Sequence, residues 1–228
     1  MNSNSTANTS RAQDSVYEFV KSRIISLEYR PGEWLKAQEI AKQLSLSRTP
    51  VREALGRLEQ EGLVKRNGKW GYLVGAISFK EVSDLFKIRE SLESLAALEC
   101  MASADEATLA DLSQTLEAAS GHLAKGDEIR TRMLNREFQA KLARATGNKL
   151  LQQLLHTLND RIWWVGSLHH KTRPARVAES LSENHDILTA IKSGDADAVR
   201  DAVLAHIRSS RESFYTYATA VLDADFRM

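Results

Sequence analysis

Two arginines four residues apart, Arg48 and Arg52, are the side chains in this sequence best placed to bind a polyanion. A spacing of four puts both on one face of a helix. The planar guanidinium group can donate two parallel hydrogen bonds to a guanine edge or to a phosphate. The apolar residues Val51, Leu55 and Leu58 follow a different stripe. The pattern therefore predicts a half-buried helix that turns two cations toward DNA.

The start of this helix is set by a serine and a proline. Ser47 is an N-cap residue type, and Pro50 falls three residues later. Proline is tolerated in a first helical turn because its missing N–H has no intrahelical partner there. The predicted helix begins near Arg48 and ends near Gly62.

The segments around this helix complete a known supersecondary pattern. Apolar spacing predicts a first helix from Asp14 and a second over 37–44. After the third helix, two β-prone runs flank Asn67-Gly68, a strong hairpin signal. Three helices and a hairpin form a winged helix-turn-helix, whose third helix enters the major groove by its N-terminus. The alternative is that the arginines only solvate a surface helix and the hairpin is incidental.

Charge and composition agree with a two-part protein. Residues 1–76 contain 12 Lys and Arg against 8 Asp and Glu, a net charge of +4, and the remainder has 19 against 22, a net of −3. A basic first part suits a polyanion.

Residues 1–13 are polar and are expected to form a disordered tail. The single cysteine, Cys100, lies in an apolar run and is expected to be buried and inert. No secretory or membrane-spanning segment is evident, so a cytoplasmic protein is expected.

The stretches LKAQEIAKQL, SRTPVREAL and RLEQEGLV, with the Pro31-Gly32 turn, resemble the winged-helix domain of GntR-type bacterial transcription regulators. The resemblance covers residues 14–76. It implies DNA contacts from the recognition helix and the wing tip, and Gln38 stands where the family often has a cation. The predicted DNA-binding residues are Gln38, Ser47, Arg48, Thr49, Arg52, Asn67, Gly68 and Lys69.

The second domain, 77–222, is predicted to be an all-α bundle of six or seven helices, followed by a tail over 223–228. Helical periodicity, with glycines and Pro174 between the segments, places helices at 79–101, 105–124, 127–145, 148–170, 177–193 and 196–222. No strand pattern appears after the hairpin. The expected fold class is therefore mostly α.

Four polar residues are predicted to point into this bundle. His206 shares a stripe with Val203, and His185 shares one with Leu181 and Leu188. Asn135 and Gln139 stand one turn apart. Histidines and amides from three helices can converge on a ligand or metal site in a bundle. Alternatively, each is a core polar group with its own hydrogen-bond partner, and spacing alone favours that second interpretation.

The segments FKIRESLESLAALE, NREFQAKLARATGN and SENHDILTAIKSGDADAV resemble the FCD-type effector domain that accompanies this winged helix in the FadR-like subfamily. The resemblance implies a divalent metal, held by one aspartate and three histidines beneath a small carboxylate effector. Here Asn135 stands at the aspartate position and Gln139 at the first histidine position, so only His185 and His206 remain as metal ligands. Two amides and two histidines are a poor cage for a divalent ion. We therefore expect no metal cofactor and a directly bound effector, with a divalent ion as the alternative.

Two further features of the bundle, Arg89 and the Trp163-Trp164 pair, each have two interpretations. Arg89 is a candidate partner for the effector's anionic group, and the alternative is a surface ion pair. Trp163 and Trp164 are adjacent and point about 100° apart, so core or interface packing is expected for them rather than a shared pocket wall.

These features predict a homodimeric, sequence-specific transcription regulator, a repressor by resemblance. It would bind palindromic operator DNA, with affinity controlled by an organic acid bound in the bundle. The alternatives are a metal-dependent enzyme fused to a DNA module and a ligand-free architectural DNA binder. The sequence contains no phosphate loop or nucleophile elbow, which argues against the enzyme.

Overall fold

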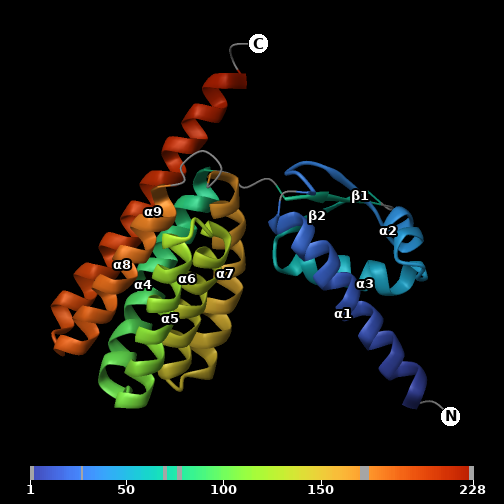
Figure 1. Ribbon diagram of the computed structural model, residues 1–228. Coiled ribbons are helices and arrows are strands. Elements are labelled where there is room, and N and C mark those ends of the chain that lie inside the picture. Colours follow the sequence, from blue (N-terminus) through green and yellow to red (C-terminus); the bar gives the residue numbers. More distant parts are fainter. Residues whose placement is uncertain (1–2, 27, 69–70, 76–78, 170–174, 226–228) are drawn as a thin grey trace. The chain divides into compact units, whose positions relative to one another are not determined.

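A computed structural model describes residues 3–26, 28–68, 71–75, 79–169 and 175–225, and the side chains of 11–26, 28–68, 71–75, 80–161 and 175–216. The chain divides into two compact units, Met1–Ser78 and Phe79–Met228 (Figure 1). Among these described ranges, no helix is long and apolar enough to cross a membrane.

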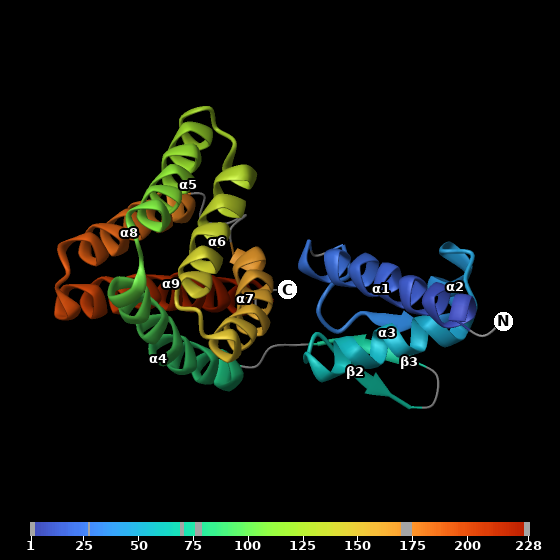
Figure 2. The same cartoon turned by 90° about the horizontal axis from the view of Figure 1, so that it is seen from below.

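The first unit combines three helices with a small antiparallel sheet of strand order β1-β3-β2 (Figure 2). Its elements are α1 (Ser3–Ile25), β1 (Trp34–Lys36), α2 (Ala37–Gln43), α3 (Arg48–Gln60), β2 (Val64–Asn67) and β3 (Gly71–Val74). This is the predicted winged helix-turn-helix.

The apolar stripes of α1 and α3 form the core of this unit. Val16, Val20 and Ile24 of α1 are fully buried, as are Val51, Leu55 and Leu58 of α3. Burying one such side chain contributes about 1.5–3 kcal/mol. The stripes therefore fix which face of α3 is left for solvent, and Arg48 and Arg52 are on that face.

The wing differs from the prediction in two ways. Strand β1 was not predicted: it has only three residues and exists because it pairs with β3, Leu35 opposite Tyr72. Asn67 is the last residue of β2 and pairs with Gly71, so Asn67-Gly68 is not itself a two-residue turn. Gly68 has φ +67, the left-handed conformation that glycine adopts without strain. Lys69 and Trp70 lie outside the described residues.

The first helix also begins earlier than predicted. It starts at Ser3 rather than at Asp14, so the segment expected to be a disordered tail is helical from Ser3. Apolar periodicity marks the part of a helix that is buried, and residues 3–13 lack an apolar stripe. The contacts of Gln13 with Glu53 and of Asp14 with Arg57 bring the start of the predicted segment against α3.

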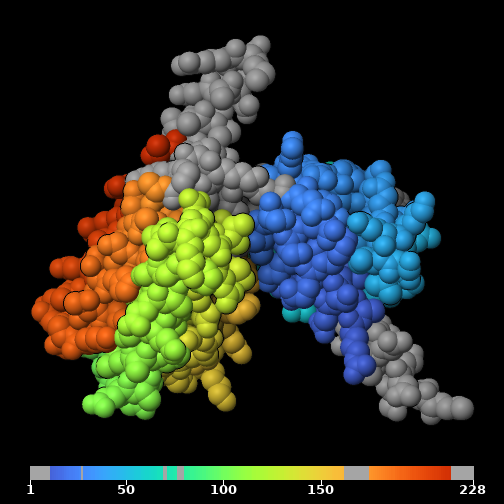
Figure 3. Space-filling view, viewed as in Figure 1, coloured from blue at the N-terminus to red at the C-terminus, as the bar shows by residue number. Residues whose placement is uncertain are grey.

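The second unit has six helices in its described part, each within three residues of its predicted ends. They are α4 (Phe79–Ser103), α5 (Glu106–Ala124), α6 (Glu128–Ala145), α7 (Lys149–His169), α8 (Ala175–Ser193) and α9 (Ala196–Asp225). Helix α9 therefore includes the first residues of the predicted tail. Trp163 and Trp164 belong to α7, and their side chains lie outside the described residues. In the space-filling view, side chains close the surface over α5, α6 and α8 (Figure 3).

Hydrogen bonds between helices fix their relative directions. Helix α5 runs antiparallel to both α6 and α8, so α6 and α8 run parallel to each other, and α9 runs antiparallel to α8. The contacts that set these directions join Thr131 to Ala119, Lys141 to Asp111, His185 to Ser120, Lys192 to Ser113, Arg176 to Ser210, and Glu183 to His206.

Candidate nucleic-acid interface and bundle site

Helix α3 begins as the sequence indicated. Ser47 occupies the N-cap position with extended backbone, although its side chain makes no capping hydrogen bond. Arg48, Thr49 and Pro50 form the first turn, and Pro50 is buried. The first four N–H groups of a helix have no intrahelical acceptor, so the proline costs no hydrogen bond and the exposed N-terminus can face an anion.

The start of α3, the start of α2 and the wing enclose an open hollow of about 610 Å³. Five predicted DNA-binding residues line it: Gln38, Arg48, Thr49, Arg52 and Gly68. Ser47 and Asn67 are exposed but are not part of the lining, and Lys69 is outside the described residues.

Two lining cations were missed, Lys36 and Arg66. Lys36 ends β1, the strand that was not predicted. Arg66 belongs to β2, next to the residues assigned to the wing tip, and its guanidinium lies over the Tyr72 ring and donates to the Tyr72 hydroxyl at 3.1 Å. The basic pair Lys65-Arg66 just before the turn was the available signal for this second cation.

The hollow is strongly electropositive. It contains four cationic side chains and no acidic residue in its lining. Lys36 pairs with Glu39 and Arg66 with Glu59 at its margin. Arg48 and Arg52 form no ion pair with any residue in the described ranges, so both are available to an external anion. This arrangement suits phosphate and base-edge contacts.

A charged cluster locks α3 to α1. The Tyr17 hydroxyl donates to Glu61 at 2.8 Å, Lys21 binds the same carboxylate, and the Arg57 guanidinium lies 3.8 Å from the centre of the Tyr17 ring. Burial raises the pKa of Tyr17, so its hydroxyl remains a donor. The cluster holds α3 against α1 on the side of α3 that is opposite Arg48 and Arg52.

Trp34 supports the wing from β1. Its indole lies so close to Gly71 that a Cβ at that position would come within 2.5 Å of the ring. Gly71 is therefore the residue that allows the tryptophan to cover the strand, and it lines the hollow as well.

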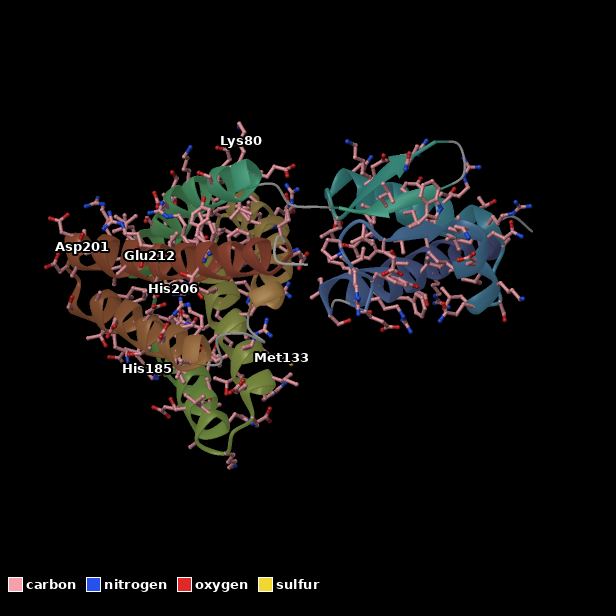
Figure 4. The ribbon with its side chains drawn as sticks, turned by 90° about the horizontal axis from the view of Figure 1, so that it is seen from above. Lys80, Met133, His185, Asp201, His206 and Glu212 are labelled. Atoms are coloured by element: carbon pink, nitrogen blue, oxygen red, sulfur yellow. The ribbon has the colours of Figure 1, made fainter. Side chains whose placement is uncertain are left out.

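In the second unit, three consecutive residues of α8 contact three different helices. The Glu183 carboxylate binds Nδ1 of His206 on α9 at 2.7 Å, Asn184 accepts from Gln139 on α6 at 2.8 Å, and Nε2 of His185 is 3.3 Å from the Ser120 hydroxyl on α5. Successive helical residues point about 100° apart. His185 and His206 therefore have separate hydrogen-bond partners and belong to different helices, α8 and α9 (Figure 4).

Two other predicted effector residues are buried in α4 and α6. Arg89 is 4% exposed and pairs with Glu93 at 2.7 Å, so it forms a buried ion pair within α4 rather than the surface pair considered. Asn135 is buried, and its side-chain oxygen has no hydrogen-bond partner among the described residues. Of the five predicted effector residues, Asn135 alone retains such an unsatisfied atom.

The residues present do not fit the metal that the resemblance implied. The amides Asn135 and Gln139 supply no charge, Gln139 is bonded to Asn184, and His206 is bonded to Glu183. Within the described ranges, no three His, Cys, Asp or Glu side chains gather as a metal would require. Imidazole and carboxylate ligands converging on one point are the usual minimum for such an ion.

Sequence reasoning missed the buried ion network centred on Glu183. Arg176 binds both oxygens of this carboxylate, at 2.9 and 2.6 Å, and also donates to Ser210. Burial by itself would raise the pKa of Glu183, but hydrogen bonds from His206 and Arg176 outweigh it and lower the pKa to about 2. Arg176 and Glu183 are seven residues apart, a same-face spacing that could have signalled the pair.

The fold and the basic hollow define a winged-helix DNA-binding protein with an appended helical domain. Residues 12–74 match the model of bacterial regulatory proteins of the gntR family, and residues 84–209 match the FCD domain. The chain belongs to the GntR family of transcription regulators and carries its FCD domain, so it is a regulator rather than an enzyme.

The similarity to known proteins extends over almost the whole chain. The HTH-type transcriptional regulator YdhC of Bacillus subtilis is 32% identical, over 86% of this chain and 88% of its own. The HTH-type transcriptional repressor RspR of Escherichia coli is 25% identical, over 90% of each. The solved structure of E. coli McbR/YncC superimposes with a TM-score of 0.78 at 23% identity, over 90% of this chain and 97% of that one, which supports the fold.

Proposed function

We propose that this regulator is a cytoplasmic repressor that binds a palindromic operator as a homodimer and is released by a small organic acid. The observation that carries the DNA-binding part is the hollow with four cations and no acid, built from the recognition helix and the wing. The name of RspR, a repressor, supports the proposed sign of regulation.

In vitro selection of DNA from a random pool tests the operator proposal. The selected sequences are expected to contain two inverted half-sites, because a two-fold dimer presents two equivalent recognition helices. Affinity for the selected site should exceed affinity for scrambled DNA by about a thousandfold or more. A steep salt dependence without sequence preference would instead support an architectural DNA binder.

Dimerisation is assigned to an apolar surface on α4 and α7. Ile88 and Leu95 of α4 and Leu150 and Leu154 of α7 are exposed, Leu95 by 41% and Leu154 by 46%. The cluster formed by Ala96, Ala143, Leu151 and Leu155 joins α4, α6 and α7, and Leu95, Leu150 and Leu154 are each next in sequence to one of its members. Exposed apolar side chains gathered beside a core cluster are typical of a subunit interface.

Replacing Leu95 and Leu154 together with glutamate is expected to convert the dimer into a monomer, because burying two carboxylates in an apolar interface is costly. Light scattering coupled to size exclusion measures the mass. Met133→Glu is the matched control, since Met133 is equally exposed (48%) but belongs to α6 (Figure 4). A dimeric double variant would refute this interface.

The effector is proposed to bind inside the bundle without a metal. Asn135, Gln139, His185, His206 and Arg89 were the sequence candidates, and the chemistry of the two amides supports direct hydrogen bonding over metal coordination. Metal content per protomer, measured by mass spectrometry before and after dialysis against a chelator, tests this. About one retained divalent ion per chain would refute it and restore His185 and His206 as ligands.

A further inference from the structure

Arg66 of β2 and Tyr72 of β3 form a pair at the wing side of the hollow. They are directly opposite each other in the antiparallel register of these neighbouring strands (Figure 2), so their side chains lie on the same face of the sheet. Both residues line the hollow. Nη2 of Arg66 donates to the Tyr72 hydroxyl at 3.1 Å, and the guanidinium lies 5.5 Å from the centre of the Tyr72 ring. The pair therefore places a guanidinium and a hydroxyl together at one margin of the hollow.

The hydroxyl of Tyr72 still has a hydrogen to donate. A tyrosine hydroxyl both accepts and donates. This one accepts from Arg66, and its own hydrogen has no acceptor among the residues that the structure describes. Tyr72 is only 5% exposed and its ring pairs with Leu35 of β1, so the end of the side chain that meets Arg66 is the part that reaches the hollow. A donor held at the edge of an electropositive hollow suits an anionic acceptor.

Glu59 of the recognition helix holds Arg66 in place. Its carboxylate accepts from the backbone N–H of Arg66 at 3.0 Å and lies 3.5 Å from Nε of the guanidinium. Glu59 itself is outside the lining of the hollow. The guanidinium carries further N–H donors at its two Nη atoms, beyond those that contact Glu59 and Tyr72. The recognition helix therefore fixes the wing arginine and leaves it donors for an external anion.

We propose that Arg66 and Tyr72 together bind one phosphate group of the DNA backbone, beside the bases that the recognition helix contacts. This inference rests on the proposed function and deepens it, because it assigns this part of the wing to a phosphate rather than to a base. Hydrogen bonds in a chain polarise one another, so a hydroxyl that accepts from a guanidinium is a stronger donor. A phosphate can then accept from the Tyr72 hydroxyl and from Arg66 at once. Such a contact positions the protein on the duplex and carries no sequence information.

Tyr72→Phe removes the hydroxyl and keeps the ring. Its affinity for duplex DNA is expected to fall at least about tenfold, because a hydrogen bond to a charged group is lost. The loss should be equal on the selected operator and on scrambled DNA, since both have the same backbone, and fluorescence anisotropy measures both. Tyr29→Phe is the matched control, a tyrosine of the same unit outside the hollow's lining, and should bind as the parent does. Parent-like affinity in Tyr72→Phe, or a loss confined to the operator, would overturn the phosphate assignment.

A double-mutant cycle tests whether the two side chains act as one unit. Arg66→Met is expected to weaken binding to both DNAs at least about thirtyfold and to reduce the salt slope by about one per arginine. Adding Tyr72→Phe should then cost less than about threefold more, because the hydroxyl has already lost the guanidinium that polarises it. Lys65→Met removes the same charge from the opposite face of β2, where Lys65 pairs with Leu73, and its loss should multiply with that of Tyr72→Phe. Fully multiplicative losses for Arg66 and Tyr72 would refute a shared phosphate site.

Chemically modified operators locate the phosphate independently. A neutral methylphosphonate, placed at each backbone position in turn, removes one negative charge from the DNA. The parent should lose affinity at one position in each half-site where the same modification leaves the affinity of Arg66→Met unchanged. Circular dichroism of each variant shows that it is folded. The absence of any such position would contradict the proposal even if both variants bind weakly.

Failure of this inference and failure of the proposed function give different results. A parent that binds selected and scrambled DNA equally would overturn site-specific regulation, while the losses in the Arg66 and Tyr72 variants remain measurable on either duplex. A parent that prefers its operator, with Tyr72→Phe unaffected, would overturn the phosphate site alone.

Discussion

Replacing Arg48 and Arg52 together with alanine is expected to weaken binding to the selected operator by at least about thirtyfold, and by as much as about ten-thousandfold. A bidentate arginine contact contributes about 1–3 kcal/mol of discrimination, and each 1.4 kcal/mol is a factor of ten. Both side chains line the hollow and form no ion pair within the described ranges. The variant therefore loses contacts to DNA without breaking an internal one.

Fluorescence anisotropy with labelled operator and scrambled DNA, at several salt concentrations, measures this effect. If the arginines read bases, the specific affinity should fall toward the non-specific value; if they bind phosphate, the salt slope should fall by about one per arginine. The matched control is Arg144→Ala with Arg208→Ala, two exposed arginines of the other unit. Parent-like operator affinity in the Arg48/Arg52 variant would exclude the hollow as the DNA-binding surface.

Glu183→Gln is expected to lower the free energy of unfolding by up to about 3–5 kcal/mol, because it leaves the buried Arg176 charge with only its longer pair to Glu179, 3.7 Å away. Arg176 is 2% exposed and holds both carboxylate oxygens. Urea unfolding followed by circular dichroism at neutral pH measures the loss. Glu137→Gln is the control, since the Glu137 carboxylate is half exposed and its ion pair among the described residues is a long one, 3.8 Å from Lys141. A change in Glu183→Gln no larger than in the control would show that the network adds nothing to stability.

The same carboxylate should make stability depend on acid pH. The pKa of Glu183 falls from the ordinary 4.5 to about 2 on folding. A lowered folded-state pKa contributes stability that is fully present above pH 4.5 and is lost as the pH falls toward 2. The contribution is about 3 kcal/mol, taking 1.36 kcal/mol per unit. Unfolding measured from pH 6 to 2.5 should therefore show a steeper loss in the parent than in Glu183→Gln, and parallel curves would contradict the assignment.

Features that depend on neighbours along the chain were predicted well. Pro50, the cap position at Ser47 and the stripe through Leu55 defined the recognition helix and the face that carries Arg48, because helical geometry converts spacing directly into direction. The six bundle helices followed for the same reason. Strand β1 was missed because three residues carry no usable period, and its pairing with β3 forms between segments distant in the chain.

Side-chain partners across the bundle were the part that the sequence did not determine. Glu183, Asn184 and His185 are consecutive residues, yet they contact three different helices: α9, α6 and α5, respectively. Which helix lies in each direction depends on how six apolar stripes pack together, and that is a property of the whole domain. The sequence by itself determined the DNA-binding helix, since its function requires only one face of one element. Only the tertiary structure decided that Asn135 and Ser213 are buried in the bundle, because burial of a polar side chain requires several helices to be packed around it at once.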